Sequence, residues 1–383
     1  MGTSPASPPS IGELRTDLVA WLDAHADEIA PPYEGAGSLA EQMTQLNRVK
    51  RLLWDAGFMG WGWPESAGGR GGPAALRAVV GEEVVERDLV VSGFFSMTET
   101  LAPTLIDFAS PELAAEFVPR LLSGQEMWSQ GFSEPGTGSD LASLACRARP
   151  DGEQWIVNGQ KVWTSLSQFA ERCLLLTRTG TPESRHRGIT AFLVDMNTPG
   201  LTVRPLSIMS GSDEFAEVFF DDVVIPDARR VGAVDGGWAV AMALLPFERS
   251  TAFWHRTAFL QSRLQAVVAD APTDDHSAAL VGEAFAQLHA LRCCSRNTVR
   301  RFDRGETLGP ETSVDKVLVA TAEQKIFDVA RALAPRRVAL PENVHDERWR
   351  DEFLYSRAAS IYGGTGEIQR NIIARRLLDL GDE

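Results

Sequence analysis

The stretch from Trp128 to Asp140 constrains the structure of this chain most, and it consists of Trp-Ser-Gln-Gly-Phe-Ser-Glu-Pro-Gly-Thr-Gly-Ser-Asp. Glycines, a proline and hydroxyl side chains are too dense between Gly131 and Ser139 for a helix interior or a regular strand. Glycines let backbone N–H groups approach a ligand, and short hydroxyls bind phosphate or ring heteroatoms. The alternative is an ordinary turn between two strands.

Two further motifs favour a ligand-binding loop over the ordinary turn, and residues Gln130 to Ser139 are called the ligand loop below. Asn-Gly-Gln-Lys-Val-Trp-Thr-Ser occupies 158–165, and Ile-Tyr-Gly-Gly-Thr-Gly-Glu-Ile-Gln-Arg-Asn occupies 361–371. In this order, the three motifs resemble those of the acyl-CoA dehydrogenase family of flavoproteins. The resemblance runs from Trp61 to the C-terminus, and Tyr-Gly-Gly-Thr at 362–365 is most similar to a bacterial branch of that family.

The apolar periodicity predicts an α+β multidomain fold. Capping boxes at Ser10 and Ser38 precede helical patterns, so residues 1–126 are predicted to form an all-α domain. Short β-prone segments follow, with Asn158-Gly159 as a hairpin signal, and predict a β-sandwich or barrel-like domain over 127–232. The helical period then returns, which predicts a helical bundle over 233–383. The resemblance implies the same three-domain architecture.

Composition excludes several classes of partner. With 37 basic and 52 acidic residues the net charge is −15, which disfavours nucleic acid and anionic membranes. A polyanionic ligand such as coenzyme A therefore requires a local basic patch. No apolar run is long enough to span a membrane, and 1–10 lack the regions of a signal peptide, so we expect a cytoplasmic protein. The cysteines show no zinc-binding spacing, so we predict no metal site and reduced, partly buried core cysteines.

The resemblance implies that the chain binds FAD. Carried over by position, the cofactor-binding residues are Gln130, Phe132, Ser133, Gly138, Ser139, Trp163, Thr164, Ser165, Thr365 and Glu367. The first five belong to the ligand loop, the next three pack on the other face of the flavin, and the last two reach the adenosine pyrophosphate. Trp163 has an alternative role as a core aromatic, and Gly364-Thr365 equally suits the boundary between two helices.

The α-proton base is predicted to be Glu248. Many family members carry a glutamate directly after the tyrosine of the C-terminal motif, but this chain has Gly363 there. Some branches instead place a glutamate before an arginine at the start of the C-terminal domain, and Glu248-Arg249 match that position. Between Phe247 and Trp254, burial is expected to raise the pKa of the glutamate. The alternative is a surface glutamate paired with Arg249 or His255. Arg249 is predicted to assist catalysis by orienting the glutamate or the substrate. Predicted substrate contacts are Ser139, Phe247, Arg249 and Gly363.

The implied reaction is FAD-dependent α,β-dehydrogenation of an acyl-CoA to the 2-enoyl-CoA, with flavin N5 as hydride acceptor and an electron-transfer flavoprotein as a partner. Fatty acid or steroid side-chain catabolism is the implied setting. One family feature is missing, because 261–276 contain Arg263 but no Arg-x-x-Phe-Gly segment for the neighbouring subunit's flavin. We therefore expect either a homodimer or homotetramer, or a heterotetramer with a related subunit. An oxidase or monooxygenase on the same fold and a non-catalytic partner subunit remain alternatives.

Overall fold

The computed structural model describes residues 7–381, which divide into two compact units. The first unit comprises the chain up to Pro64, Gly69–Met97 and the chain from Pro246 onward. The second comprises Glu65–Gly68 and Thr98–Leu245. Met1–Ala6, on which the expectation about a signal peptide partly rests, lie outside the described residues.

The first unit is helical, and its first helices begin where the sequence predicts. Ser10 and Ser38 each form a capping box, with Glu13 and Glu41, and so supply partners for the first free N–H groups of α1 and α3. The early helices are α1 (Ile11–Ala24), α2 (Ala26–Ile29), α3 (Leu39–Asp55), α4 (Ala75–Glu86) and the first turns of α5 (Ser92–Phe108).

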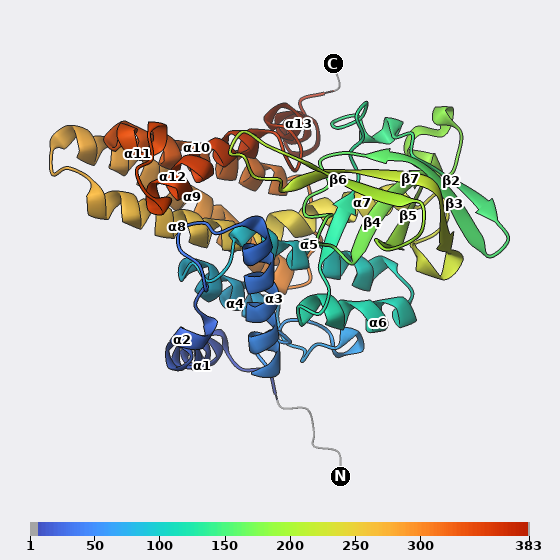
Figure 1. Cartoon of the computed structure of the whole chain (residues 1–383), viewed down its shortest axis with the longest axis horizontal. Helices are drawn as coiled ribbons and strands as arrows, with labels where there is room; N and C mark the ends of the chain where they lie inside the picture. The colour runs from blue at the N-terminus through green and yellow to red at the C-terminus, as the bar shows by residue number, and fades with distance from the viewer. Residues whose placement is uncertain (1–6, 382–383) are drawn as a thin grey trace, which may run out of the picture. The chain divides into compact units, whose positions relative to one another are not determined.

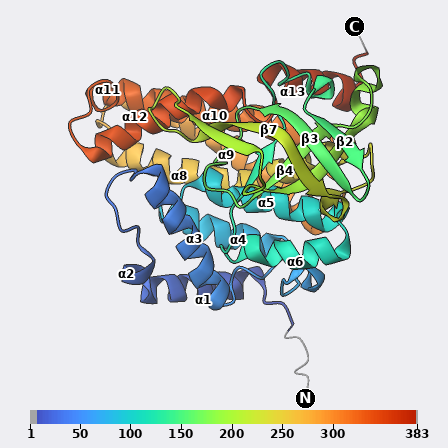
Figure 2. The ribbon, with the colours of Figure 1, turned by 45° about the vertical axis from the view of Figure 1, so that its right-hand side comes forward.

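The C-terminal part of the first unit is a bundle of long helices. Its helices are α8 (Phe253–Asp270), α9 (Asp275–Asp303), α10 (Thr312–Leu333), α11 (Pro335–Ala339), α12 (Val344–Ser356) and α13 (Gly366–Ile372). Helices α8, α9 and α10 pack against one another and lie side by side in both views (Figures 1 and 2). The region 331–348 holds the end of α10, all of α11 and the start of α12.

The second unit contains the remainder of α5, α6 (Pro111–Leu122), most of α7 (Gly237–Phe247) and one eight-stranded sheet. The strand order is β6-β7-β3-β2-β4-β5-β8, with β1 beside β4. The strands are β1 (Trp128–Gly131), β2 (Arg147–Asp151), β3 (Gln154–Lys161), β4 (Arg172–Arg178), β5 (Ile189–Asp195), β6 (Leu201–Leu206), β7 (Phe215–Pro226) and β8 (Arg230–Val231).

The sheet has two halves that share one apolar core. Strands β2 and β4 are joined through a single pair, Arg147 with Arg178, so the ladder is nearly interrupted there. Trp155 and Val218 from one half nevertheless share a buried cluster with Cys173 and Phe192 from the other. The two halves therefore enclose a common interior, which is the packing of a sandwich or barrel-like domain. The predicted α+β fold class is thus confirmed, whereas the exact domain limits at 126 and 232 stay predictions.

The hairpin expected at Asn158-Gly159 is wrong. Strand β3 continues through both residues, and the chain reverses earlier, after Asp151. The pairing of β3 with β7 shifts register between Val157 and Gly159, which marks a β-bulge. Glycine is required at the bulge because a Cβ on Gly159 would lie 2.7 Å from Cα of Cys146.

Two further expectations concern cysteines and membranes. Cys146 and Cys173 are buried and all four thiols are free, but Cys293 is exposed on α9, so the expectation of core burial is wrong for that residue. Burial raises the pKa of the Cys146 thiol to about 12. Within residues 7–381, none of the helices combines the length and the apolar character needed to cross a membrane.

Candidate active site

The predicted ligand loop follows the short strand β1. Phe132 is buried and Ser133 half-buried, while the turn that follows reaches the surface. Glu134 and Thr137 exchange two backbone hydrogen bonds of 2.9 and 3.0 Å across the Pro135-Gly136 turn. Beyond it, Gly138 and Ser139 are exposed, and a Cβ on Gly138 would meet open space. The loop therefore offers accessible backbone and hydroxyl groups on a fixed turn.

A buried ion pair holds the ligand loop to strand β3. The Lys161 ammonium is fully buried and donates to Glu134 at 2.7 Å and to the Phe132 carbonyl at 3.1 Å. Glu134 also accepts from the backbone N–H groups of Ala145 and Cys146, at 2.6 and 2.9 Å. Sequence reasoning missed this pair, although both residues lie inside the quoted motifs. The only signal was a lysine in an otherwise half-buried strand, because lysine is rarely buried unless paired.

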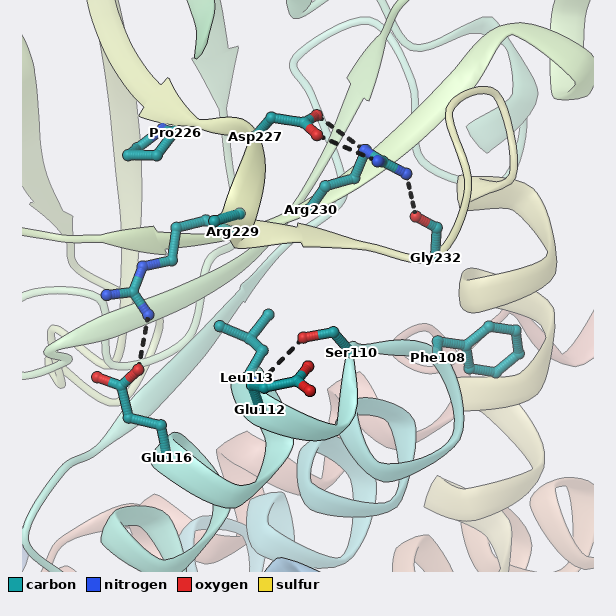
Figure 3. A pocket seen from close by; sticks show the side chains of 11 residues that line it. Phe108, Ser110, Glu112, Leu113, Glu116, Pro226, Asp227, Arg229, Arg230 and Gly232 are labelled. Carbon is teal, nitrogen blue, oxygen red and sulfur yellow. Dashed lines mark hydrogen bonds and ion pairs between the residues drawn. The ribbon is translucent and has the colours of Figure 1, made fainter. Parts of the chain in front are cut away.

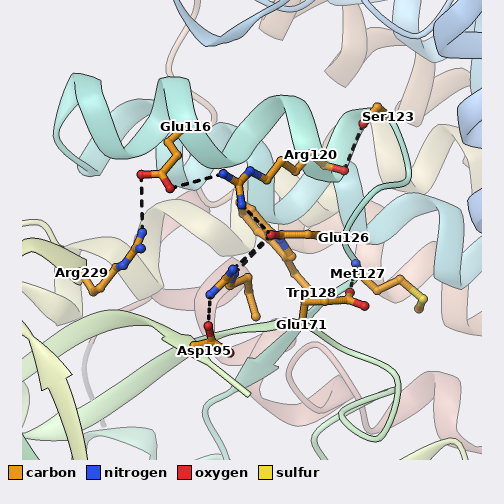
Figure 4. A network of polar contacts seen from close by, with 10 residues as sticks. Glu116, Arg120, Ser123, Glu126, Met127, Trp128, Glu171, Asp195 and Arg229 are labelled. Carbon is orange, nitrogen blue, oxygen red and sulfur yellow. Dashed lines mark hydrogen bonds and ion pairs between the residues drawn. The ribbon is translucent and has the colours of Figure 1, made fainter. Parts of the chain in front are cut away.

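A second polar network fixes the start of β1 (Figure 4). Glu126 accepts from the Trp128 indole at 3.1 Å and from Arg120 and Arg172 at 3.2 and 3.1 Å. Burial opposes ionisation of Glu126, but the hydrogen bonds from Arg172 and Trp128 outweigh it and lower the pKa of this carboxyl group. Because α6, β1 and β4 meet at one ionised carboxylate, the ligand loop begins from a rigid point.

Trp163 lies in a strained turn directly after β3. Its φ of +58° is unfavourable for a bulky side chain, and Leu166 has a similar φ of +59°. The ring is 58 % exposed and contacts Phe215 edge to face, so the alternative of a core aromatic is wrong within this unit. The backbone of Thr164 pairs with Ala216 in both directions at 3.1 Å, which holds the turn in place. Ser165 follows and is half-buried.

The predicted base lies on an irregular helical segment. A π-type turn spans Glu248–Ala252 directly after α7, and Ser250 within it has non-helical φ and ψ. Such π-type turns are frequently found at functional sites. Glu248 is half-buried, and its carboxylate makes no hydrogen bond or ion pair within the described part of the chain, although it acts electrostatically on the neighbouring Arg249. Its role as base or as a surface partner stays a prediction.

Glu248 and Gly363 lie directly against each other. A Cβ on Gly363 would lie 2.5 Å from Oε1 of Glu248, and Gly363 has a φ of +63°. The glycine therefore leaves the space that the carboxylate occupies. The position where many relatives of the resembled family carry a glutamate is thus filled here by a glutamate from a different segment.

Arg249 and Gln369 hold the other side of this turn. Each donates to the Gly363 carbonyl at 3.2 Å. Arg249 is buried, and burial lowers the pKa of its guanidinium despite the nearby Glu248 and Asp315. Phe247 lies outside this contact and packs edge to face on Phe302.

The C-terminal motif forms a helix start beside a small cavity. Thr365 caps α13 by accepting from the Ile368 N–H at 3.3 Å, which agrees with the helix-boundary role, and Glu367 is exposed. A cavity of about 100 Å³ adjoins this start. Its walls include Lys316, Gln324, Ala359, Gly364, Gly366 and Gln369.

The segment 261–276, which should carry Arg-x-x-Phe-Gly, comprises the C-terminal part of α8, a short link and the start of α9. Arg263 is paired with Asp88 and, at 3.1 Å, with Glu352. The acidic residues also have structural partners, because Asp270 pairs with Arg337 at 2.9 Å and Asp274 caps α9. Arg263 therefore already has two carboxylate partners.

A basic loop beside the ligand loop was also missed. Arg185, His186 and Arg187 are consecutive and exposed, and the short helical segments 141–143 and 182–188 pack together. Arg185 pairs with Asp140 at 2.9 Å and has a strained φ of +48°. The sequence signal was the basic triplet itself, which stands out in an acidic chain.

A cavity of about 680 Å³ also lies in the second unit, between the start of α6 and the end of β7 (Figure 3). Its arginines are neutralised, since Arg230 lies 2.9 Å from Asp227 and Arg229 lies 3.8 Å from Glu116. None of the predicted site residues lines it.

The helical unit thus places a carboxylate against a glycine turn, and the sheet unit carries an accessible Gly/Ser loop. Sequence models described as the N-terminal, middle and C-terminal domains of acyl-CoA dehydrogenase match residues 13–125, 129–223 and 235–378. The chain therefore belongs to the acyl-CoA dehydrogenase family, whose members are FAD-containing oxidoreductases.

Individual relatives agree with this membership. The chain is 36 % identical over 394 residues to acyl-CoA dehydrogenase IpdE1 of Mycobacterium tuberculosis, covering 97 % of this chain and 98 % of that protein. A probable acyl-CoA dehydrogenase from Mycobacterium abscessus superimposes with a TM-score of 0.81 at 26 % identity, covering 97 % of this chain and 99 % of that one. A steroid acyl-CoA dehydrogenase, Tcur3481-Tcur3483, shares the fold, with a TM-score of 0.84 at 24 % identity and full coverage of both chains.

The residues present fit FAD in each unit taken separately. Within the described residues, the buried hydroxyls of Thr137 and Thr164 and the amide oxygen of Gln369 have no hydrogen-bond partner. Buried polar groups normally have partners, so these atoms are suited to a polar ligand. In the second unit, the exposed Trp163 ring, next to Thr164 in the chain, offers a flat apolar surface, which suits a fused aromatic ring.

Proposed function

We propose that this chain dehydrogenates an acyl-CoA thioester at its α and β carbons, giving the 2-enoyl-CoA, with Glu248 as the α-proton base. The observation that carries this proposal is the Glu248 carboxylate seated in the space left by Gly363. Bound FAD supplies the acceptor for the β-hydride, which no protein side chain provides. The α proton then requires a carboxylate that is available to accept it.

Glu248 meets that requirement in two ways. Its carboxylate has no hydrogen bond or ion pair within the described residues, so its lone pairs are available to the substrate. The neighbouring turn is held by Arg249 and Gln369 through the Gly363 carbonyl, which restricts where the carboxylate lies. Arg249 is thus a positioning residue, and the predicted substrate contacts at Phe247, Gly363 and Ser139 remain part of the proposal.

The cofactor-binding part of the proposal rests on the rigid ligand loop. Ser133, Gly138, Ser139, Thr164 and Ser165 supply backbone and hydroxyl groups, and Trp163 supplies a flat surface. Gln130 and Phe132 fix the loop from strand β1 and its end, and Thr365 and Glu367 are proposed to serve the adenosine pyrophosphate. The exposed triplet Arg185-His186-Arg187 is proposed to neutralise the phosphates of coenzyme A, because the rest of the chain is strongly acidic.

The experiment combines a substrate panel with one substitution. Short, branched, long and steroid side-chain CoA thioesters are mixed anaerobically with the purified holoprotein, and the flavin absorbance is recorded. Bleaching by at least one thioester is expected. Glu248→Gln should keep the flavin spectrum and lose turnover by about 10⁴-fold, since no other base replaces it. Glu283→Gln on the exposed face of α9 is the matched control and should behave as the unchanged protein.

Two results separate this proposal from its alternatives. Retained turnover in Glu248→Gln would move the base elsewhere. Rapid oxygen consumption by the reduced protein without another acceptor would instead indicate an oxidase or monooxygenase. A protein that passes electrons to a dye or to an electron-transfer flavoprotein, but slowly to oxygen, agrees with a dehydrogenase.

We further propose that the flavin site of this chain is completed by a related but different subunit. The supporting observation is that Arg263 on α8, the one arginine of segment 261–276, already has Asp88 and Glu352 as carboxylate partners. The chain purified alone should then be colourless and become yellow on co-expression with such a subunit. A stoichiometric yellow homo-oligomer would overturn this assembly and leave the proposed reaction intact.

A further inference from the structure

Helix α10 buries a lysine beside the candidate base. Lys316 is 2 % exposed, and its ammonium donates to the Ala359 carbonyl at 2.6 Å. It also lies 4.3 Å from the centre of the Tyr362 ring, one residue before Gly363. Lysine is almost never fully buried without a counter-charge, yet Lys316 has no carboxylate at ion-pair distance among the described residues. The buried charge therefore requires an explanation.

Glu248 is the carboxylate that is best placed to act as the counter-charge of Lys316. A Cβ on Gly363 would lie 2.5 Å from Oε1 of Glu248 and 3.4 Å from Cε of Lys316, so both side chains lie against one glycine. The other acidic group that acts on Lys316, Glu323, is already engaged by Arg256 at 2.6 and 2.9 Å. A cation and a carboxylate that have no ion pair among the described residues thus lie against the same turn.

We infer that Lys316 is a positioning residue for the dehydrogenation, which supplies the counter-charge that keeps the Glu248 carboxylate ionised and holds the Tyr362-Gly363 turn against it. The inference rests on the proposed role of Glu248. A fixed cation lying against the same glycine favours the ionised form of a neighbouring carboxylate. Burial lowers the pKa of Lys316 to about 8, and Glu248 limits that decrease, so the lysine is still charged at neutral pH.

Other charged groups near the pair are accounted for. Arg249, on the same segment as Glu248, donates to the Gly363 carbonyl, and Asp315 on α10 accepts from Thr298 at 2.5 Å. Arg256 on α8 is bound to Glu323. Arg249 adds positive potential at Glu248, so the removal of Lys316 should weaken that potential without abolishing it.

The test is the pH dependence of kcat/KM for the thioester that turns over best in the panel, with a dye as electron acceptor. In Lys316→Met, the acidic limb of this pH profile should move to a higher pH by about one unit, because removal of a nearby cation disfavours the ionised form of the carboxylate. Below that pKa, kcat/KM should fall about 10-fold, and at pH 8.5 it should change little. Lys316→Arg, which keeps the charge, should restore the limb.

A matched control separates charge from structural support. Gln324, on the same helix, donates to the carbonyls of Ser356 and Arg357 at 3.3 and 3.5 Å, so Gln324→Leu removes a tether to this region without removing a charge. It should leave the limb in place. If Lys316→Met does not retain flavin, Lys316→Gln provides a neutral side chain that can still donate. If neither neutral variant folds, a displaced limb in Lys316→Arg contradicts the inference.

The outcomes are distinguishable from those of the proposed function. A uniform loss of kcat/KM at all pH values in the neutral variants, with an unmoved limb, would show purely structural support and overturn this inference. The assignment of Glu248 as the base would still stand after such a loss in the Lys316 variants, provided that Glu248→Gln is inactive. Turnover retained in Glu248→Gln would overturn both.

Discussion

The ligand loop in the sheet unit and the Glu248 turn in the helical unit are both built around glycines, but they are stabilised in different ways. In the loop, Lys161 pairs with Glu134, and Glu126 pairs with Arg172. In the turn, Glu248 and Lys316 lie against Gly363 without direct pairing. A group that must only hold a ligand can be fully satisfied, whereas a group that must accept a proton has to remain available.

The largest expected effect concerns the ligand loop, where a buried ion pair is removed. Lys161→Met leaves Glu134 buried without its cation, which should reduce the free energy of unfolding by roughly 3–5 kcal/mol. Chemical denaturation followed by fluorescence measures it. Arg185→Met removes the exposed pair with Asp140 and is the matched control, with less than about 1 kcal/mol expected. Equal effects of the two substitutions would show that burial of the pair is irrelevant.

The second prediction contrasts one carboxyl group from each region as the pH changes. Burial raises the pKa of Asp315, beside the Glu248 turn, to about 6 from its usual 3.8. Its stabilising contribution is therefore complete below 3.8 and is lost as the pH rises through 6, and the difference corresponds to roughly 3 kcal/mol. The stability of the unchanged protein relative to Asp315→Asn should accordingly fall by that amount between pH 4 and pH 7.

Glu126, at the ligand loop, should behave in the opposite direction. Its pKa is lowered, because hydrogen bonds from Arg172 and Trp128 outweigh burial. Its contribution is therefore present above the usual pKa of 4.5 and is lost as the pH falls. Glu126→Gln should destabilise the protein most at neutral pH. Parallel pH profiles for the Asp315 and Glu126 variants would contradict the comparison.

Local patterns predicted one region better than the other. The loop at 128–140 was recognisable because its residues are contiguous, and the capping boxes at Ser10 and Ser38 because they depend on neighbours in the chain. Contacts between distant segments could not be predicted from the sequence. The seat of Glu248 against Gly363 depends on tertiary packing, and the lysines 161 and 316 contradict the rule that lysine is exposed. The Asn158-Gly159 error has the same origin, since β7 pairs with β3 through the predicted turn.

The third prediction concerns the turn directly. Gly363→Ala places a methyl group 2.5 Å from Oε1 of Glu248 at a φ of +63°, so the carboxylate must move. Displacement of a catalytic group by about 1 Å costs about 100-fold, and kcat/KM should fall by that factor with the flavin spectrum retained. Gly282→Ala on α9, where a Cβ meets open space, is the control and should be silent. Full activity in Gly363→Ala would show that the carboxylate does not need this seat.

The smallest expected effect concerns Arg187 in the basic loop beside the ligand loop. It tests whether this loop binds the phosphates of coenzyme A. Arg187 is exposed, so Arg187→Ala should leave folding unchanged and raise KM for an acyl-CoA about 3- to 10-fold, with kcat unaltered. An acyl-pantetheine thioester, which lacks the nucleotide phosphates, should show no such difference between the two proteins. The increase in KM should shrink at high salt, because screening already weakens the attraction of an exposed arginine for phosphate. An equal increase for both thioesters would place the effect on the acyl or pantetheine part and leave the basic triplet without a role in phosphate binding.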